Sequence, residues 1–296
     1  MIAPADTLLF ACVRNEAERL PYFLEYHRQM GVDHFLVVDN ASDDGGAELL
    51  LAQPDVSLWR STASYRKSRF GIDWINHLLA CHGSGHWCLT LDADELFVYA
   101  HSETRSLKDL TRWLDAQGVD SLGALMLELY PKGPLGDGDY AAGDDPLVVV
   151  PFFDPDGYRW QVQPRTGAMW VQGGPRDRVF FAGMPDRAPT LNKVPLVRWH
   201  WRYAYVNSTH SLFPNRLNAV GAPASGLILH TKFLPSSVDR AVTEQARGEH
   251  FGVPGHYAEY YAGLASNPTL YHDRSLAYEG WRQAEALGLM SRGGWD

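Results

Sequence analysis

The first hundred residues alternate short apolar runs with amphipathic segments, and this alternation limits the folds that the chain can adopt. The apolar runs at 7–15, 34–40 and 86–99 have the length and composition of buried strands. Between 16 and 31, apolar residues recur at helical spacing, and Gly31 ends that segment. Strands that alternate with helices usually pair in parallel, with helices on both faces of the sheet. The pattern therefore predicts an α/β fold with a mostly parallel sheet.

The second part of the chain has a different pattern. Residues 131–147 are rich in Gly, Pro and Asp, which predicts a long loop, and 236–290 regain helical spacing. Neither an internal repeat nor a low-complexity linker divides the chain. We therefore expect one domain over 1–296, with a ligand-binding half at 1–100 and a mixed α+β half at 101–296.

Composition excludes several classes of protein. The chain has 35 acidic and 26 basic residues, a net charge of −9, so general nucleic-acid binding is not expected. An odd count of three cysteines argues against a disulfide framework. The N-terminus lacks a basic leader, and no run approaches the about 18 apolar residues of a membrane-spanning helix. These features predict a cytoplasmic protein without a transmembrane segment, while peripheral membrane association stays open.

An acidic cluster follows the apolar residues that begin the run at 86–99. This run is the fourth predicted strand, after those at 7–15, 34–40 and 56–61. Asp92 and Asp94 are two residues apart in LTLDADELF, and in extended geometry they point to the same side. Two such carboxylates repel each other unless a cation lies between them. A hard divalent ion with oxygen ligands, Mg²⁺ or Mn²⁺, suits this arrangement and would stabilise a diphosphate leaving group. A solvated acidic turn is the alternative interpretation.

The segment CVRNEAERLPYFLEYHRQMGVDHFLVVDNASDDG, followed by LDADELF, resembles the family 2 type of glycosyltransferases with the GT-A fold. The similarity is to the subgroup that opens with an "RNE…EYH…G" segment. It is specific over residues 8–99 and looser over 173–180, 193–199 and 227–233. The resemblance implies a Rossmann-like, GT-A-type sheet that binds a nucleotide-diphosphate sugar, and a second half that faces the acceptor.

The resemblance also implies roles for individual residues. Residues of the strand ends and adjoining loops would contact the nucleotide or its diphosphate, namely Arg14, Glu16, Asp39, Asn40, Asp43, Arg69 and Asp92. Asp94 would be a direct metal ligand, Asp92 would meet the ribose or the metal, and Glu95 would be an orienting group. His230 would complete the metal site, although a buried core histidine is the alternative. Imidazole favours Mn²⁺ over Mg²⁺.

Basic side chains near these positions suit phosphate, because a guanidinium grips phosphate with a planar fork. Arg69 ends SYRKSR, the most basic stretch of an acidic chain. Lys232 follows His230 by two residues and could neutralise a departing phosphate. In GGPRDRVFF, an extended backbone would place Arg176 and Arg178 on one side and Asp177 on the other.

The predicted reaction moves a sugar from a nucleotide-diphosphate donor to a saccharide or other hydroxyl acceptor, with inversion implied by the family likeness. The resemblance also implies a role in surface-polysaccharide or glycoconjugate synthesis. In inverting enzymes a carboxylate takes the acceptor proton, and Asp177 and Glu249 are the two candidates for this base.

Two other functions compete with this prediction. A nucleotidyltransferase acting on sugar phosphates should carry a glycine-rich basic loop after the first strand, and CVRNEAERL has no glycine. A non-catalytic carbohydrate-binding protein would explain the ten tryptophans, with Trp199 and Trp201 as a sugar platform or simply as packed side chains. It would not explain Asp92 and Asp94 at the end of a strand.

Overall fold

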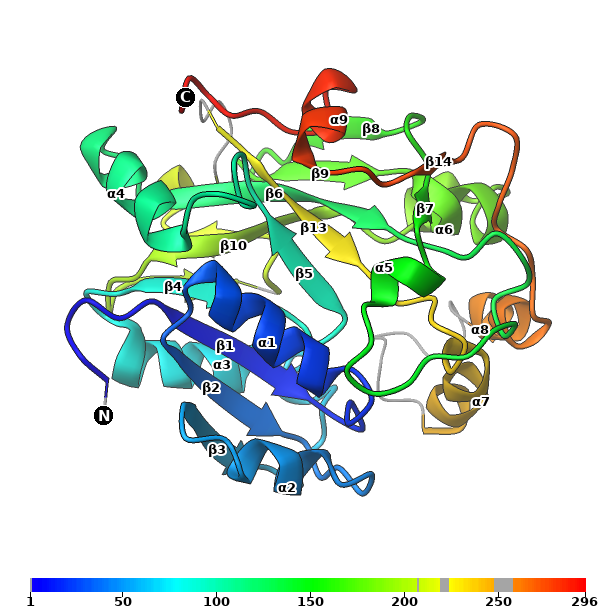
Figure 1. Ribbon diagram of the computed structural model, residues 1–296, viewed down its shortest axis with the longest axis horizontal. Helices are drawn as coiled ribbons and strands as arrows, with labels where there is room; N and C mark the ends of the chain where they lie inside the picture. Colours follow the sequence, from blue (N-terminus) through cyan, green and yellow to red (C-terminus); the bar gives the residue numbers. More distant parts are fainter. Residues whose placement is uncertain (1, 207, 219–223, 248–257) are drawn as a thin grey trace.

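The structure is a computed structural model that describes residues 2–206, 208–218, 224–247 and 258–296. A central eight-stranded sheet has the order β3-β2-β1-β4-β10-β6-β13-β5 (Figure 1). The strands of the described chain are β1 (Leu8–Val13), β2 (His34–Asp39), β3 (Val56–Arg60), β4 (Trp87–Thr90), β5 (Glu95–Val98), β6 (Ser121–Glu128), β7 (Phe152–Phe153), β8 (Arg159–Val162), β9 (Met169–Gln172), β10 (Asn192–Arg198), β11 (Ala204–Tyr205), β12 (Leu212–Phe213), β13 (Gly226–His230) and β14 (Leu276–Ala277).

Most strands of this sheet run in the same direction. Pairing is parallel among β3, β2, β1 and β4 and between β6 and β13. Strand β10 is antiparallel to β4 and to β6, and β5 is antiparallel to β13. Only β10 and β5 therefore oppose the other strands of the sheet. The carboxyl ends of the parallel strands and the amino ends of β10 and β5 consequently meet at one edge. The predicted α/β fold with a mostly parallel sheet is confirmed.

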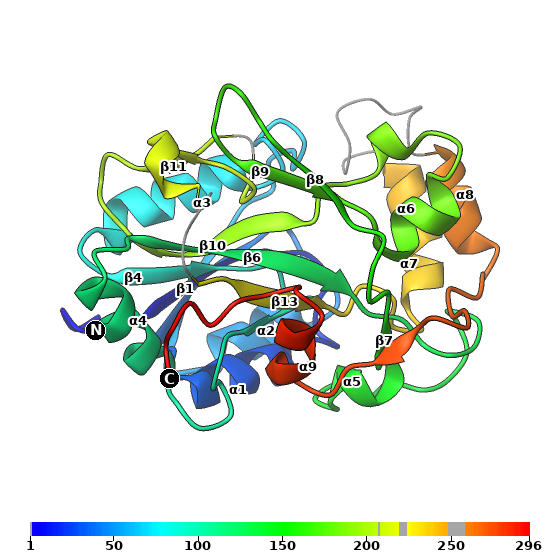
Figure 2. The same ribbon diagram turned by 90° about the horizontal axis from the view of Figure 1, so that it is seen from above.

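Helices cover both faces of the sheet, as Figures 1 and 2 show. The helices of the described chain are α1 (Leu20–Met30), α2 (Gly46–Leu51), α3 (Ile72–Leu78), α4 (Leu107–Ala116), α5 (Pro146–Val149), α6 (Gly174–Phe180), α7 (Ser237–Arg247), α8 (Ala258–Ala265) and α9 (Trp281–Ala286). Alternate residues of β1 enter different cores. Leu9 and Ala11 join the core under α1, α4 and α9, whereas Leu8 and Phe10 join the core under α3. This alternation follows from the period of two of a strand.

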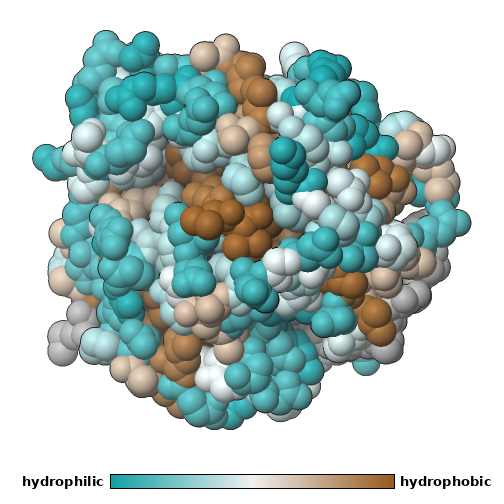
Figure 3. Space-filling model, turned by 45° about the vertical axis from the view of Figure 1, so that its right-hand side comes forward, coloured by the Kyte–Doolittle hydropathy of each residue, from teal (hydrophilic) through white to brown (hydrophobic). Residues whose placement is uncertain are grey.

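A third apolar cluster lies beyond the carboxyl ends of β6 and β13. It joins α6, α7 and α8 through Phe181, Ala241, Tyr260 and Leu264 (Figure 2). Helix α7 follows β13 closely, so this cluster lies next to the edge where the strands end. The face in Figure 3 is mostly hydrophilic and carries a few hydrophobic areas. Every helix of the described chain is too short or too polar to cross a lipid bilayer.

The structure corrects the predicted strand at 86–99. This run forms two strands, β4 and β5, which lie in different parts of the sheet. A turn at 91–94 separates them, and the N–H of Glu95 donates to the carbonyl of Asp92 at 3.1 Å. The apolar residues on both sides of the turn are buried, so hydrophobicity alone gave no sign of the break.

Candidate active site

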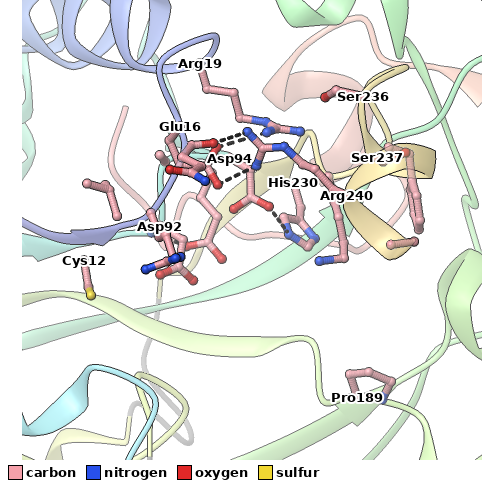
Figure 4. A pocket seen from close by; sticks show the side chains of 18 of the residues that line it. Cys12, Glu16, Arg19, Asp92, Asp94, Pro189, His230, Ser236, Ser237 and Arg240 are labelled. Carbon is pink, nitrogen blue, oxygen red and sulfur yellow. Dashed lines mark hydrogen bonds and ion pairs between the residues drawn. The ribbon is translucent and has the colours of Figure 1, made fainter. Parts of the chain in front are cut away.

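One pocket of about 540 Å³ opens at the edge where the parallel strands end (Figure 4). Its walls come from the ends of β1, β2, β4 and β13, from the start of β10, and from α7. Among the predicted site residues, those that line it are Arg14, Glu16, Asn40, Asp92, Asp94, Arg176, His230 and Lys232. The sheet topology thus brings together side chains that are more than two hundred residues apart in the sequence.

Asp92 and Asp94 take separate partners because they lie in a turn and not in a strand. The Asp92 carboxylate has a side-chain exposure of 56% and accepts from Nζ of Lys193 at 3.0 Å. Asp94 lies deeper and contacts His230, with 3.1 Å between its Oδ2 and Nε2 of the ring. The extended backbone expected for this segment is replaced by a turn, and both aspartates nevertheless line the pocket.

His230 links two carboxylates. Its Nδ1 lies 3.7 Å from Oε1 of Glu128, which is fully buried and also paired with Arg176. Burial would lower the pKa of His230, but Asp94 and Glu128 outweigh it and raise that pKa. Burial would likewise raise the pKa of Asp94, but the charges of His230, Lys232 and Arg19 hold it well below its ordinary value. Asp94 and His230 thus shift each other's pKa in opposite directions.

Lys193 lies between Asp92 and Glu95. Its side-chain exposure is 6%, and Nζ donates to both carboxylates. Burial raises the pKa of Glu95 to about 7, and Lys193 limits this rise. The pKa of Lys193 itself is raised, because the two carboxylates outweigh the effect of burial. A side chain of the protein therefore already supplies one cation to the acidic cluster.

Asp94, Glu95 and His230 form a set of donors that fits a divalent metal. Each offers one ligand atom, and these atoms lie within 4.8 Å of one another. Two carboxylates and one imidazole suit Mn²⁺, and less well Mg²⁺. Asp92, which the sequence placed among the metal ligands, is not part of this set. Glu95 takes its place, because the turn carries its side chain back toward the site.

The first loop of the chain is tied to α7 by charge. Arg240 donates to Oε1 of Glu16 at 2.7 Å and also to the carbonyl of Asn15. Buried Arg19 contacts Glu16 at 3.0 Å, as the dashed lines of Figure 4 show. Arg14 donates to the carbonyl of Asn40 at 2.5 Å. These bonds give the pocket a rim of guanidinium groups next to the ends of β1 and β2.

Three predicted ligand contacts lie away from the pocket lining. Asp39 is fully buried and accepts from the N–H of Ser42 and from Arg60. It therefore shapes the loop after β2. Asp43 is exposed. Arg69 forms an ion pair with Asp73 and donates to a backbone carbonyl. Arg69 is therefore held by protein groups outside the pocket lining.

The segment around Arg176 is helical, contrary to the extended prediction. Helix α6 sends Arg176 to Glu128, whereas Arg178 binds both oxygens of buried Asp154 at 3.0 Å. Asp177, predicted as a general base, is held by Arg159 at 2.6 Å and lies outside the pocket lining. A proline near the start of the segment fits the first turn of a helix, which the extended interpretation overlooked.

Two tryptophans and one glutamate remain among the predicted residues. Trp199 is packed in the core with Tyr205, which agrees with the packing alternative. Trp201 is 60% exposed, with Arg202 over its ring, so the two tryptophans form no joint platform. Glu249, the second candidate base, lies outside the described residues.

Sequence reasoning missed several residues that build the site, and some of them had a signal. Glu128 ends an apolar run, as Asp92 and His230 do, so the same rule on strand ends could have found it. Lys193 begins an apolar run. It lies at the site because β10 is antiparallel to β4, a direction that the sequence does not reveal. Arg19 and Arg240 carry no pattern that sets them apart from surface arginines.

Comparison with known proteins gives only distant likenesses. No protein-family model and no curated protein matches the chain. One similar structure is a 4-diphosphocytidyl-2C-methyl-D-erythritol synthase, at 17% identity over 48% of this chain and 68% of that one, with a TM-score of 0.28. A Bacillus anthracis protein assigned as a glucose-1-phosphate thymidylyltransferase, in complex with sucrose, has 11% identity over 96% and 95% of the two chains and a TM-score of 0.35. HddC from Yersinia pseudotuberculosis has 8% identity over 78% and 79%, with a TM-score of 0.31. Likenesses this distant do not indicate what this chain binds.

Proposed function

We propose that the protein is a metal-dependent glycosyltransferase that moves a sugar from a nucleotide-diphosphate sugar to a hydroxyl acceptor. One observation carries the proposal: Asp94, Glu95 and His230 converge in a pocket that cationic side chains also line. A site with both features suits a metal-bound diphosphate better than a neutral sugar, because each phosphate needs positive charge. This argues against a protein that only binds carbohydrate.

In this proposal each part of the pocket has a separate task. Asp94, Glu95 and His230 would hold Mn²⁺ or Mg²⁺, which supplies positive charge beside the departing diphosphate. Lys232 lines the same pocket and would add a second charge there. Arg14 and Asn40 lie at the ends of β1 and β2 and would contact the nucleoside, as is usual at this edge of an α/β sheet. Lys193 would keep Asp92 and Glu95 oriented.

A binding experiment tests the metal site directly. We expect Mn²⁺ to bind the parent protein in calorimetry and to raise its melting temperature further when UDP or GDP is added. Asp94→Asn should weaken Mn²⁺ binding at least about tenfold, because it removes a charged ligand. Asp92→Asn is the matched control, since Asp92 lies outside the set of three donors. Equal losses in both variants would place the metal elsewhere.

Product analysis separates the proposed function from its closest rival. A glycosyltransferase releases a nucleoside diphosphate from a nucleotide-sugar. A nucleotidyltransferase acting on sugar phosphates would instead release pyrophosphate from a nucleoside triphosphate. Incubation of the protein with Mn²⁺ and each class of substrate, followed by chromatography of the nucleotides, shows which product forms. Pyrophosphate release alone would replace the proposed function with the rival.

A further inference from the structure

Helix α7 begins next to the proposed metal ligands. Strand β13 ends at His230, six residues follow, and α7 starts at Ser237. A strand that leads into the start of a helix is a common setting for phosphate, because the first N–H groups of a helix have no partner within it. In the described part of the chain, the N–H groups of Val238 and Asp239 make no hydrogen bond. The helix has eleven residues, so its partial positive charge at this end is well developed.

Ser237 gives an independent sign that a ligand belongs at this position. Its residue exposure is 6%, it lines the pocket, and its Oγ has no hydrogen-bond partner in the described structure. An unsatisfied buried hydroxyl costs on the order of 1–3 kcal/mol, so such groups normally have a partner. Its neighbour Ser236 differs, because its hydroxyl donates to Glu18. Figure 4 shows both serines at the start of α7.

Lys232 adds a cationic side chain to this wall. It lies between His230 and Ser237 in the sequence and lines the pocket. Within the described residues it forms no hydrogen bond and no ion pair, unlike Lys193 and Arg240. The acid of the first turn, Asp239, is exposed, where water screens its charge. A donor hydroxyl, free N–H groups and an unpaired ammonium thus lie along one short stretch of chain.

We propose that Ser237, the first turn of α7 and Lys232 form a phosphate-binding subsite next to the metal ligands. The identity of the phosphate rests on the proposed function. It belongs either to the diphosphate of the donor or to a phosphorylated acceptor, and both present the same oxygen acceptors. The hydroxyl and the N–H groups donate to these oxygens, and Lys232 balances their charge.

Two variants and one control test the subsite. Ser237→Ala and Lys232→Met each remove a polar group that makes no hydrogen bond or ion pair with the described residues, so both should fold, which a thermal scan checks. Ser236→Ala is the matched control, because that hydroxyl already has a partner. The first measurement compares the affinities of UDP and GDP with those of UMP and GMP, in MnCl₂. The second titrates inorganic phosphate into protein saturated with the diphosphate.

The outcomes distinguish the two sources of phosphate. If both variants weaken the diphosphates about tenfold or more and leave the monophosphates unchanged, the subsite holds the donor. If both instead abolish the binding of inorganic phosphate to the loaded protein, it holds the acceptor. Variants that match the parent and Ser236→Ala in both measurements would overturn the subsite. If no nucleotide binds the parent but inorganic phosphate binds and needs Ser237, the subsite stands and the nucleotide-sugar function falls.

Discussion

Lys193 shows how a single residue sets the charge of the site. The acidic turn at 91–95 suggests an unbalanced cluster when it is read alone, and a divalent ion is then the simplest counter-charge. In the fold, Lys193 reaches Asp92 and Glu95 from a strand about a hundred residues away in the sequence. It neutralises part of the cluster, whereas Asp94 pairs with His230. A lysine thus supplies counter-charge to a cluster that, from the sequence alone, requires a bound ion.

Replacing this lysine should destabilise the protein. Lys193→Met leaves the buried carboxylate of Glu95 without its cation, so we expect the free energy of unfolding to fall by about 3 kcal/mol. The double variant Lys193→Met/Glu95→Gln should recover part of this loss, because it removes the stranded charge. Denaturant titration of the parent, both single variants and the double variant measures the coupling. Additive losses would show that the two side chains do not stabilise each other.

At the scale of elements, α1 depends on a neutral histidine. His27 lies in α1 and is fully buried, and its Nδ1 forms a hydrogen bond with the carbonyl of Phe23 at 2.8 Å. Burial lowers its pKa to about 4. The ordinary value applies in the unfolded chain, so that state binds the proton first as the pH falls. The free energy of unfolding is therefore highest, with respect to His27, above the ordinary pKa of histidine. It falls as the pH drops from that value toward 4.

This asymmetry predicts acid sensitivity of the fold. The free energy of unfolding should lose about 2 kcal/mol between pH 7 and pH 5 through His27 alone. His27→Leu removes the titrating group and should show a correspondingly smaller loss over the same range. Urea titrations of the parent and the variant at both pH values provide the comparison. Identical losses in the two proteins would assign the acid sensitivity to other groups.

Strand β13 depends on a glycine at its start. A Cβ on Gly226 would lie 2.8 Å from Cε2 of Phe97 and 2.9 Å from the carbonyl oxygen of Val98, closer than real contacts allow. Gly226→Ala should therefore destabilise the β5–β13 pair by about 1–3 kcal/mol. Gly183→Ala is the control, because nothing lies within 4 Å of its added Cβ. Thermal unfolding of both variants checks this, and equal melting temperatures would contradict it.

At the scale of the whole molecule, the two halves of the chain share one sheet. Strand β4 pairs with β10, and β5 pairs with β13, so residues 1–100 leave two strands without partners on one side. The pocket is shared in the same way, since Asp94 comes from the first half and His230 from the second. Together these pairings favour a single cooperative domain over two independent units.

A truncated chain tests this cooperation. A fragment of residues 1–100 should fail to fold, because the apolar residues of β4 and β5 lose the strands that bury them. The full chain should instead unfold in one transition. Circular dichroism and thermal scans of both proteins make the comparison. A fragment that melts cooperatively would mean that the first half is a domain of its own.

Much of the fold was visible in the sequence, and less of the site. The alternation of strands and helices predicted parallel strands. Arg14, Asn40 and His230, which follow or end strands, line the pocket. The prediction failed where local context mattered. Asp92 and Asp94 take different partners because a turn follows β4, and Arg178 binds Asp154 because α6 is helical. A short charged segment can adopt either geometry, and its packing partners select one.

What the sequence determined by itself is the period of its hydrophobic residues. This period specified β1, β2, the helix between them and the edge of the sheet where polar residues gather. The tertiary structure alone decided that β10 and β5 run against the other strands, and this reversal delivers Lys193 and Glu95 to the site. The physical reason is that strand pairing is a contact between distant parts of the chain. An apolar run must be buried, but its composition does not specify the direction in which it runs or the neighbour that covers it.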